Sequence, residues 1–307
     1  MDHDQRFKSL IREFFADFLR LFFADWAARF DLSSVEWLDK ELLPDPPEGS
    51  RHLLDLVARL RTLQRVDEAQ PADPEQWLAL IHIEIESPDR TTRVKPRLPA
   101  YYVHLRDKYG SPVLPIVIYL KVGLNGIGID TYGESFWDFE ILNLNFLYVG
   151  LPGLNAVEYL QGDNWLGVAL TALMQIPTDQ AAKLGAEALR RLTEAPLTEQ
   201  QRFLLADCVQ AYLPLSEAQR REYNRIMTGE SYSKVMAMNQ TVFERGIEKG
   251  VEKGLQSTLL RQGQKRFGPA SKEIEDRIHE IHDLERLEAL TDRILAAQNW
   301  DELLAGM

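Results

Sequence analysis

Trp77-Leu-Ala-Leu-Ile-His-Ile-Glu-Ile-Glu-Ser87 is a mostly apolar stretch that carries two carboxylates. Such a run is typical of a buried strand. Because side chains alternate along a strand, His82, Glu84 and Glu86 should point to one face and the intervening isoleucines to the other. Two acids on one face indicate either the solvated side of a half-exposed strand or a site where a bound group compensates their charge.

A second apolar run lies upstream and carries a single acid. His52-Leu-Leu-Asp-Leu-Val-Ala-Arg-Leu60 predicts a strand with Asp55 inside it. Burying an uncompensated charge costs several kcal/mol, so a partner is expected. Three carboxylates from two neighbouring strands would form the oxygen-rich site that Mg²⁺ prefers. The alternative is an ion pair between Asp55 and an arginine, with Glu84 and Glu86 facing water.

Further stretches carry a resemblance that covers nearly the whole chain. They are Asp2-His-Asp-Gln-Arg-Phe-Lys8, Leu38-Asp-Lys-Glu-Leu-Leu-Pro44, Ala100-Tyr-Tyr-Val-His-Leu-Arg-Asp-Lys-Tyr109, Leu114-Pro-Ile-Val-Ile-Tyr-Leu120 and Gly246-Ile-Glu-Lys-Gly-Val-Glu-Lys-Gly254. Together with an acid in one strand and a Glu-x-Glu ending in the next, they resemble the PD-(D/E)XK nuclease superfamily. More narrowly, the chain resembles its Rpn (recombination-promoting nuclease) branch, also described as YhgA-like transposases.

The resemblance implies a metal-dependent endonuclease that acts on DNA. Asp55, Glu84 and Glu86 fall on its three motif positions, with Asp55 and Glu84 holding Mg²⁺ or Mn²⁺. Glu86 stands where many members carry lysine and where this branch often carries glutamine. A lysine there would orient the attacking water and stabilise charge on the phosphate. A glutamate can instead bind metal or accept the proton of the water.

A basic segment follows the two acids. It is Asp89-Arg-Thr-Thr-Arg-Val-Lys-Pro-Arg97, and within it Arg93, Lys95 and Arg97 are the predicted phosphate contacts. Lysine and arginine neutralise the nucleic-acid backbone and position the strand. The alternative is an ordinary solvated loop that balances a surplus of acids.

Two weaker site candidates lie close to the acids in sequence. Glu41, in the element before the first strand, could supply a fourth acid. His82 shares the face of Glu84 and Glu86, where it could join the site. A structural histidine held by hydrogen bonds is the alternative for His82.

The order of elements predicts an α/β protein. After the two acidic strands, a helix is expected from about Leu98 to Lys108, with Pro99 in its first turn. Pro112 to Leu120 is a continuous apolar run, typical of a strand buried on both faces. Residues 139–149 alternate like another strand. The prediction is a mixed sheet flanked by helices, as in a restriction-endonuclease-like core.

Beyond Leu151-Pro-Gly153 the apolar periodicity becomes helical. Helices are predicted over residues 165–176, 178–193, 198–212, 258–267 and 271–297. The expected domains are a PD-(D/E)XK nuclease-like core (1–155), a helical extension (156–240), a glycine-repeat helix or linker (241–257) and a small C-terminal helical domain (258–307).

The glycine repeat allows two interpretations. Gly246, Gly250 and Gly254 are four residues apart and would form a stripe along a helix. Each interior glycine costs about 1 kcal/mol relative to alanine, so a stable helix needs packing that offsets it. Close approach of two helices in a homodimer through residues 243–255 would do so. The alternative is a polar, partly ordered linker.

Composition restricts the environment and the partners. The net charge of −12 argues against broad coating of nucleic acid and favours a local DNA contact patch. The single cysteine, Cys208, lies at a helix core position and fits a reducing compartment. No signal peptide and no membrane span are expected, so a cytoplasmic location is predicted. The aromatic residues from Phe7 to Trp26 indicate a buried helix.

The leading hypothesis is therefore a magnesium-dependent DNA endonuclease, linked to recombination through the family it resembles. One alternative is a nuclease-fold protein that has lost catalysis and binds DNA or protein as an oligomeric module. Another is an oligomeric scaffold centred on the glycine-repeat helix.

Overall fold

The computed structural model describes residues 3–38, 42–43, 52–53, 55–68, 70–86, 94–229 and 232–304; for residues 3–4, 42–43, 52–53 and 236–249 it describes the backbone alone. The chain divides into two compact units, Asp2–Met236 and Ala237–Met307. Glu41 and Arg93, two of the candidate site residues, lie outside the described residues.

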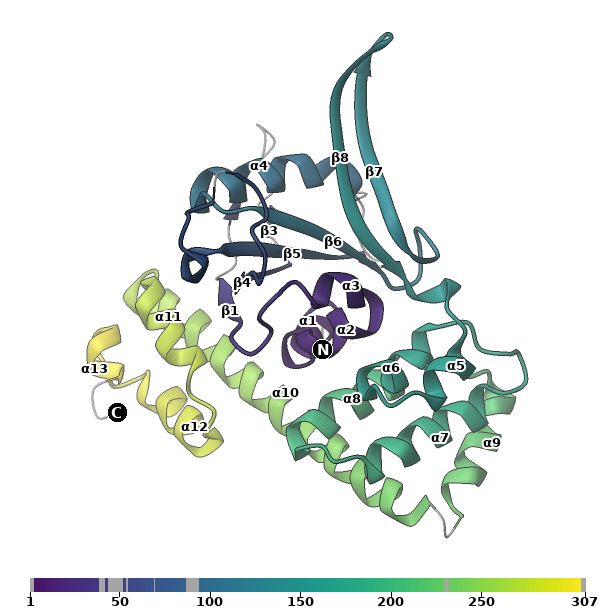
Figure 1. Cartoon of the computed structure of the whole chain (residues 1–307). Coiled ribbons are helices and arrows are strands. Elements are labelled where there is room, and N and C mark those ends of the chain that lie inside the picture. Colours follow the sequence, from purple (N-terminus) through teal and green to yellow (C-terminus); the bar gives the residue numbers. More distant parts are fainter. Residues whose placement is uncertain are drawn as a thin grey trace. The chain divides into compact units, whose positions relative to one another are not determined.

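The first unit combines a sheet with helices before and after it (Figure 1). Its strands are β1 Glu36–Leu38, β2 Leu42–Leu43, β3 His52–Leu53, β4 Leu56–Arg61, β5 Leu78–Glu86, β6 Val113–Tyr119, β7 Gly126–Phe136 and β8 Phe139–Gly150. Its helices are α1 His3–Glu13, α2 Phe15–Phe22, α3 Ala24–Ala27, η1 Pro74–Gln76, η2 Lys95–Arg97, α4 Leu98–Tyr109, η3 Leu151–Gly153, α5 Ala156–Gln161, α6 Trp165–Leu170, η4 Thr171–Leu173, α7 Ala181–Glu194, α8 Glu199–Tyr212 and α9 Glu217–Met227.

Six strands form one mixed sheet in the order β1-β4-β5-β6-β8-β7. The β5–β6 and β6–β8 pairs are parallel, whereas β1–β4, β4–β5 and β7–β8 are antiparallel. A separate pair joins β2 to β3. The mixed sheet with flanking helices confirms the α/β class. The predicted strands at 112–120 and 139–149 are also confirmed, as β6 and β8.

Helix α4 connects β5 to the parallel strand β6 and covers one face of the sheet, while α1–α3 lie on the other (Figure 1). Pro99 occupies its first turn, as predicted, and Gly110 ends it with φ +62° in the left-handed region. Tyr101 and Leu105 pack against Val57 of β4 and Leu80 of β5. This packing fixes the helix over the strands that carry the acids.

The N-terminal helices present the predicted aromatic stripe to the core. Their fully or nearly fully buried residues include Phe7, Leu10, Ile11, Phe14 and Phe18. The segment is interrupted where α1 ends and α2 begins, so it forms short helices in place of one long one. The stripe packs inside the protein, as predicted.

Three local predictions are corrected in the first unit. Asp55 lies in a bend between β3 and β4, so the apolar run 52–60 is two short strands and not one. Strand β7 was not predicted, because its glycines and polar residues give weak strand propensity. Its hydrogen bonds come from pairing along β8. Helix α9 was also missed, since it is short and mostly polar.

All the secondary-structure elements described in the second unit are helices, joined by short loops. Its elements are the end of α10 (Ser233–Phe267), α11 Lys272–His279, α12 Leu284–Arg293 and α13 Trp300–Leu304. The core comprises Leu259, Ile278, Ile281, Leu287, Leu290, Ile294, Ala297, Trp300, Leu303 and Leu304. The predicted single helix over 271–297 is wrong, because α11 ends at His279 and a new helix, α12, begins at Leu284. Asp283 caps α12 by accepting a hydrogen bond from the Arg286 N–H.

The glycine repeat is part of one continuous helix, α10, which is longer than the predicted 258–267 segment. A Cβ placed on Gly250 or Gly254 would meet no atom within 4 Å. Close helix packing within the described chain is therefore not the reason for glycine at these two positions. In the part of the chain that the structure describes, each helix is too short or too polar to cross a bilayer.

Candidate functional site

The antiparallel pairing of β4 and β5 brings the first two acids together. Leu56 is opposite Ile83, so Asp55 comes next to Glu84 in the following register position. The backbone N–H of Asp55 donates to Glu84 Oε1 at 3.2 Å. In turn, Asp55 Oδ2 accepts from the backbone N–H of Ile85 at 2.7 Å. The two segments thus hold each other's carboxylates in place.

Asp55 is neutralised by a lysine from the N-terminal helix. Lys8 Nζ lies 2.8 Å from Asp55 Oδ1, and the two side chains are 7% and 0% exposed. Sequence reasoning assigned no role to Lys8. A signal was present in the sequence, since Lys8 precedes the apolar Ile11 by three residues and Phe15 by seven, which is the spacing of one helix face. A lysine on a buried face needs an acidic partner.

Glu84 is fully buried and is held from two sides. Besides the Asp55 N–H, its Oε1 lies 3.0 Å from His82 Nε2. The His82 ring packs edge-on against Tyr101 of α4, with 5.4 Å between ring centroids. With a proton on Nε2, His82 would donate a hydrogen bond to Glu84 Oε1 and so orient the carboxylate. His82 therefore contacts an acid of the site, and its ring is also held by packing against Tyr101.

Glu86 lies on the same strand but is held differently. Its Oε2 accepts a hydrogen bond from the Val94 N–H at 3.0 Å, and the residue is 8% exposed. Nearby, burial raises the pKa of the Tyr119 phenol well above its usual range, and the negative charge of Glu86 adds to this effect. Tyr119 is therefore a neutral phenol beside this carboxylate.

Two of the predicted phosphate contacts, Lys95 and Arg97, lie in η2, directly before α4. Lys95 Nζ forms an ion pair with Asp130 of β7 and lies 5.8 Å from the centre of the Phe146 ring. The Arg97 guanidinium stacks over Tyr101 at 5.9 Å. Its buried Nε and Nη2 atoms have no hydrogen-bond partner among the described residues. Unsatisfied buried donors are costly and call for an acceptor.

A divalent cation fits the donor chemistry of Asp55 and Glu84, both hard oxygen ligands from adjacent segments. Among the described side chains, no three His, Cys, Asp or Glu groups converge in a way that could hold a metal ion. Mg²⁺ needs no such cage, because it keeps several waters and uses one or two carboxylates together with substrate phosphates. Asp55 and Glu84 are the two carboxylates on adjacent segments that a partly hydrated Mg²⁺ could use here.

Cys208, the only cysteine, takes no part in this arrangement. It is buried in α8, and burial raises the pKa of its thiol well above the usual range. A neutral, inaccessible thiol is a packing residue, as predicted.

No protein-family model, curated protein or solved structure matches the chain.

Proposed function

We propose that the chain is a metal-dependent DNA endonuclease, with Asp55 and Glu84 as the acids that hold Mg²⁺ or Mn²⁺. The observation that carries this proposal is the pair of reciprocal hydrogen bonds by which each of these two buried carboxylates accepts from the backbone of the other's segment. Burying two adjacent acids costs free energy unless a cation compensates them. Lys8 places one positive charge against Asp55, and a divalent cation would add positive charge beside both acids.

Each neighbouring residue has a definite task in this mechanism. A bound divalent cation would polarise the phosphate and lower the pKa of the attacking water. Lys8 fixes the Asp55 carboxylate, and His82 fixes that of Glu84. Glu86, held by the Val94 N–H, is the candidate acceptor for the proton of the water.

Arg97 is the candidate contact for the DNA backbone. Two of its guanidinium nitrogens have no hydrogen-bond partner among the described residues, and a phosphate oxygen that reached them would accept a charge-assisted hydrogen bond. Lys95 is already paired with Asp130, so a phosphate would have to share or displace that partner. Arg97 is therefore the stronger of the two assignments, and Arg93 stays a prediction.

The test is cleavage of supercoiled plasmid with Mg²⁺ by the wild type, Asp55→Asn and Glu84→Gln. Asp31→Asn is the matched control, because it removes the same charge from an acid outside the site. We expect nicking by the wild type and by the control, and none by the two site variants or in EDTA. Folded wild-type protein that leaves the plasmid intact would refute the proposal.

The second candidate is a nuclease-fold protein that binds DNA or protein without cleaving. The Lys8–Asp55 ion pair favours it, since a site already neutralised has less need of a metal. In this case DNA binding would persist unchanged in EDTA, and Asp55→Asn would not reduce it.

A further inference from the structure

The β7–β8 ribbon ends in an exposed aromatic tip. Phe136 and Phe139 are paired across a two-residue turn, and they are 60% and 72% exposed. Trp137 in the turn is 88% exposed. Its φ of +55° lies in the left-handed region, which bulky residues rarely adopt. The Phe136 and Trp137 rings lie 4.8 Å apart, so they form one apolar surface.

The tip is exposed because the ribbon extends beyond the other strands of the sheet (Figure 1). Aromatic side chains that stay exposed to water add no hydrophobic stabilisation to the fold. Exposed apolar surfaces of this kind often mark interaction sites. Aromatic residues are also the side chains most enriched among binding hot spots. The tip therefore has the character of an anchor for another molecule.

The charge of the ribbon restricts its partner. Residues 122–150 contain four acids and no lysine or arginine. Asp130 is paired with Lys95, whereas Glu134, Asp138 and Glu140 surround the tip. Negative charge repels nucleic-acid phosphates and anionic lipid surfaces. The complementary partner is an apolar pocket with a basic rim.

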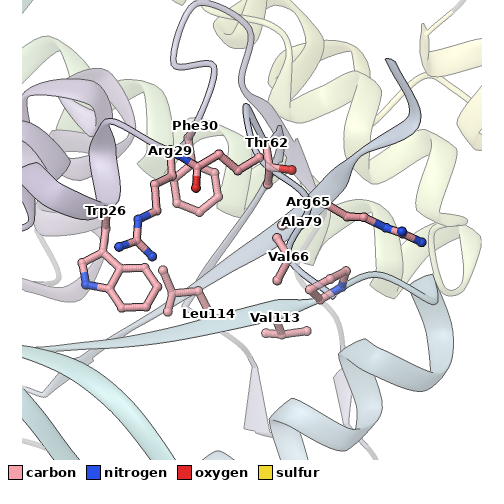
Figure 2. Close-up of a pocket in the computed structure, with 11 residues that line it drawn as sticks. Trp26, Arg29, Phe30, Thr62, Arg65, Val66, Ala79, Val113 and Leu114 are labelled. Carbon is pink, nitrogen blue, oxygen red and sulfur yellow. The ribbon is translucent and has the colours of Figure 1, made fainter. Parts of the chain in front are cut away.

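The same unit carries such a pocket at the other end of β4 from Asp55 (Figure 2). The cavity of about 390 Å³ is lined by apolar side chains that include Trp26, Val66 and Leu114. Among the described residues that line it, the charged ones are Arg29 and Arg65. Figure 2 shows the Arg29 guanidinium beside Trp26 on one side of the pocket. On the other side, the Arg65 guanidinium points away from the lining side chains and donates to the Glu68 and Gln70 carbonyl oxygens.

We propose that the aromatic tip of one copy inserts into this arginine-flanked pocket of a second copy. The apolar rings would enter the apolar cavity, and the acids around the tip would face the Arg29 guanidinium. The contact is heterologous, because the tip and the pocket are different surfaces of the chain. The pair as a whole then keeps one free tip and one free pocket, so further copies can add. This inference is independent of the proposed nuclease function.

Analytical ultracentrifugation of the full chain tests the proposal. The tip variant is Trp137→Ser/Phe139→Ser, and the pocket variant is Arg29→Glu/Val66→Glu, which adds acids opposite the acidic tip. Leu295→Ser is the matched control, since Leu295 is 76% exposed in the other unit. We expect concentration-dependent association of the wild type and the control, weakened at least about tenfold in each variant, as for loss of an aromatic anchor.

Mixing the two variants separates this contact from any other. The tip variant keeps an intact pocket and the pocket variant keeps an intact tip, so their mixture should form a 1:1 heterodimer that grows no further. Circular dichroism checks that both variants are folded. A monomeric wild type, undiminished association of the tip variant, or a mixture that stays monomeric would each overturn the proposal.

Discussion

Lys8 Nζ lies 2.8 Å from Asp55 Oδ1, and this buried ion pair joins the N-terminal helix α1 to the start of β4. The pair has two consequences. It orients the first acid of the proposed site, and it makes the stability of the protein depend on a charge that the proposed mechanism also uses.

Lys8→Met should destabilise the protein strongly. The substitution preserves most of the side-chain volume but removes the positive charge that lies against the buried Asp55 carboxylate. Removing one partner of a buried pair typically costs about 3–5 kcal/mol. Urea unfolding of the full chain measures the change in the free energy of unfolding.

The double variant Lys8→Met/Asp55→Asn is the control for this prediction. It removes both charges, so it should recover a large part of the stability that Lys8→Met loses. Additive losses in the double-mutant cycle would show that the two side chains do not interact.

Metal binding should stabilise the wild type and not its site variants. A ligand that binds only the folded state adds about 2.7 kcal/mol when its concentration is 100 times its Kd. MgCl₂ or MnCl₂ should therefore raise the Tm of the wild type, with no rise for Asp55→Asn or Glu84→Gln. Differential scanning calorimetry measures the Tm of each protein with and without the metal. An equal rise in all three proteins would place the metal elsewhere.

DNA binding should respond to Arg97 through its salt dependence. Each phosphate contact contributes about −0.9 to the slope of log K against log salt on duplex DNA. Arg97→Gln should flatten that slope by about this amount, and Arg190→Gln, in a surface ion pair on α7, should leave it unchanged. Fluorescence anisotropy at several salt concentrations provides the slopes. Identical slopes for Arg97→Gln and the wild type would remove Arg97 from the interface.

Glycine-to-alanine substitutions along α10 should change the stability of the second unit in opposite directions, depending on the position. A Cβ on Gly263 would overlap the Trp300 ring, so Gly263→Ala should destabilise the second unit. Gly250→Ala and Gly254→Ala meet open space and should stabilise the helix by up to about 1 kcal/mol each. Hydrogen exchange of α10–α13 measures both effects. Destabilisation by Gly250→Ala would instead support a homodimer through this helix.

Asp31 should titrate well below an ordinary aspartate. The Ser33 hydroxyl, followed by the Arg61 guanidinium, lowers its pKa to about 2. Because the folded-state pKa lies below that of the unfolded chain, the stabilisation is present above about pH 3.9 and is lost as the pH falls through 2. Carboxyl ¹³C NMR should show the low midpoint, with a larger rise in Ser33→Ala than in Arg61→Gln. An ordinary midpoint in the wild type would contradict this account.

The sheet and the grouping of acids were predictable because both depend on local patterns. The isoleucines of β5 and the apolar run of β6 encode strands directly, and alternation places His82 and Glu84 on one face. Antiparallel pairing of two strands that are consecutive in the sheet and joined by residues 62–77 then brings Asp55 beside Glu84. Neither step requires knowledge of distant parts of the chain.

The remaining features depend on tertiary contacts. The partner of Asp55 comes from α1, far away in sequence, so the pattern around Asp55 indicated a cation but not which one. Strand β7 exists through its pairing with β8. The role of Gly263 depends on the position of Trp300. None of these contacts leaves a periodic signal in the sequence.

The most direct test of the proposed site is a crystal of the wild-type protein soaked with Mn²⁺ and measured for anomalous scattering. The account predicts a peak bonded to carboxylate oxygens of both Asp55 and Glu84, at about 2.0–2.2 Å. A Glu84→Gln crystal treated in the same way should lack it. Clear density for the Lys8–Asp55 ion pair, with no peak beside either acid, would contradict the metal site and favour the non-catalytic alternative.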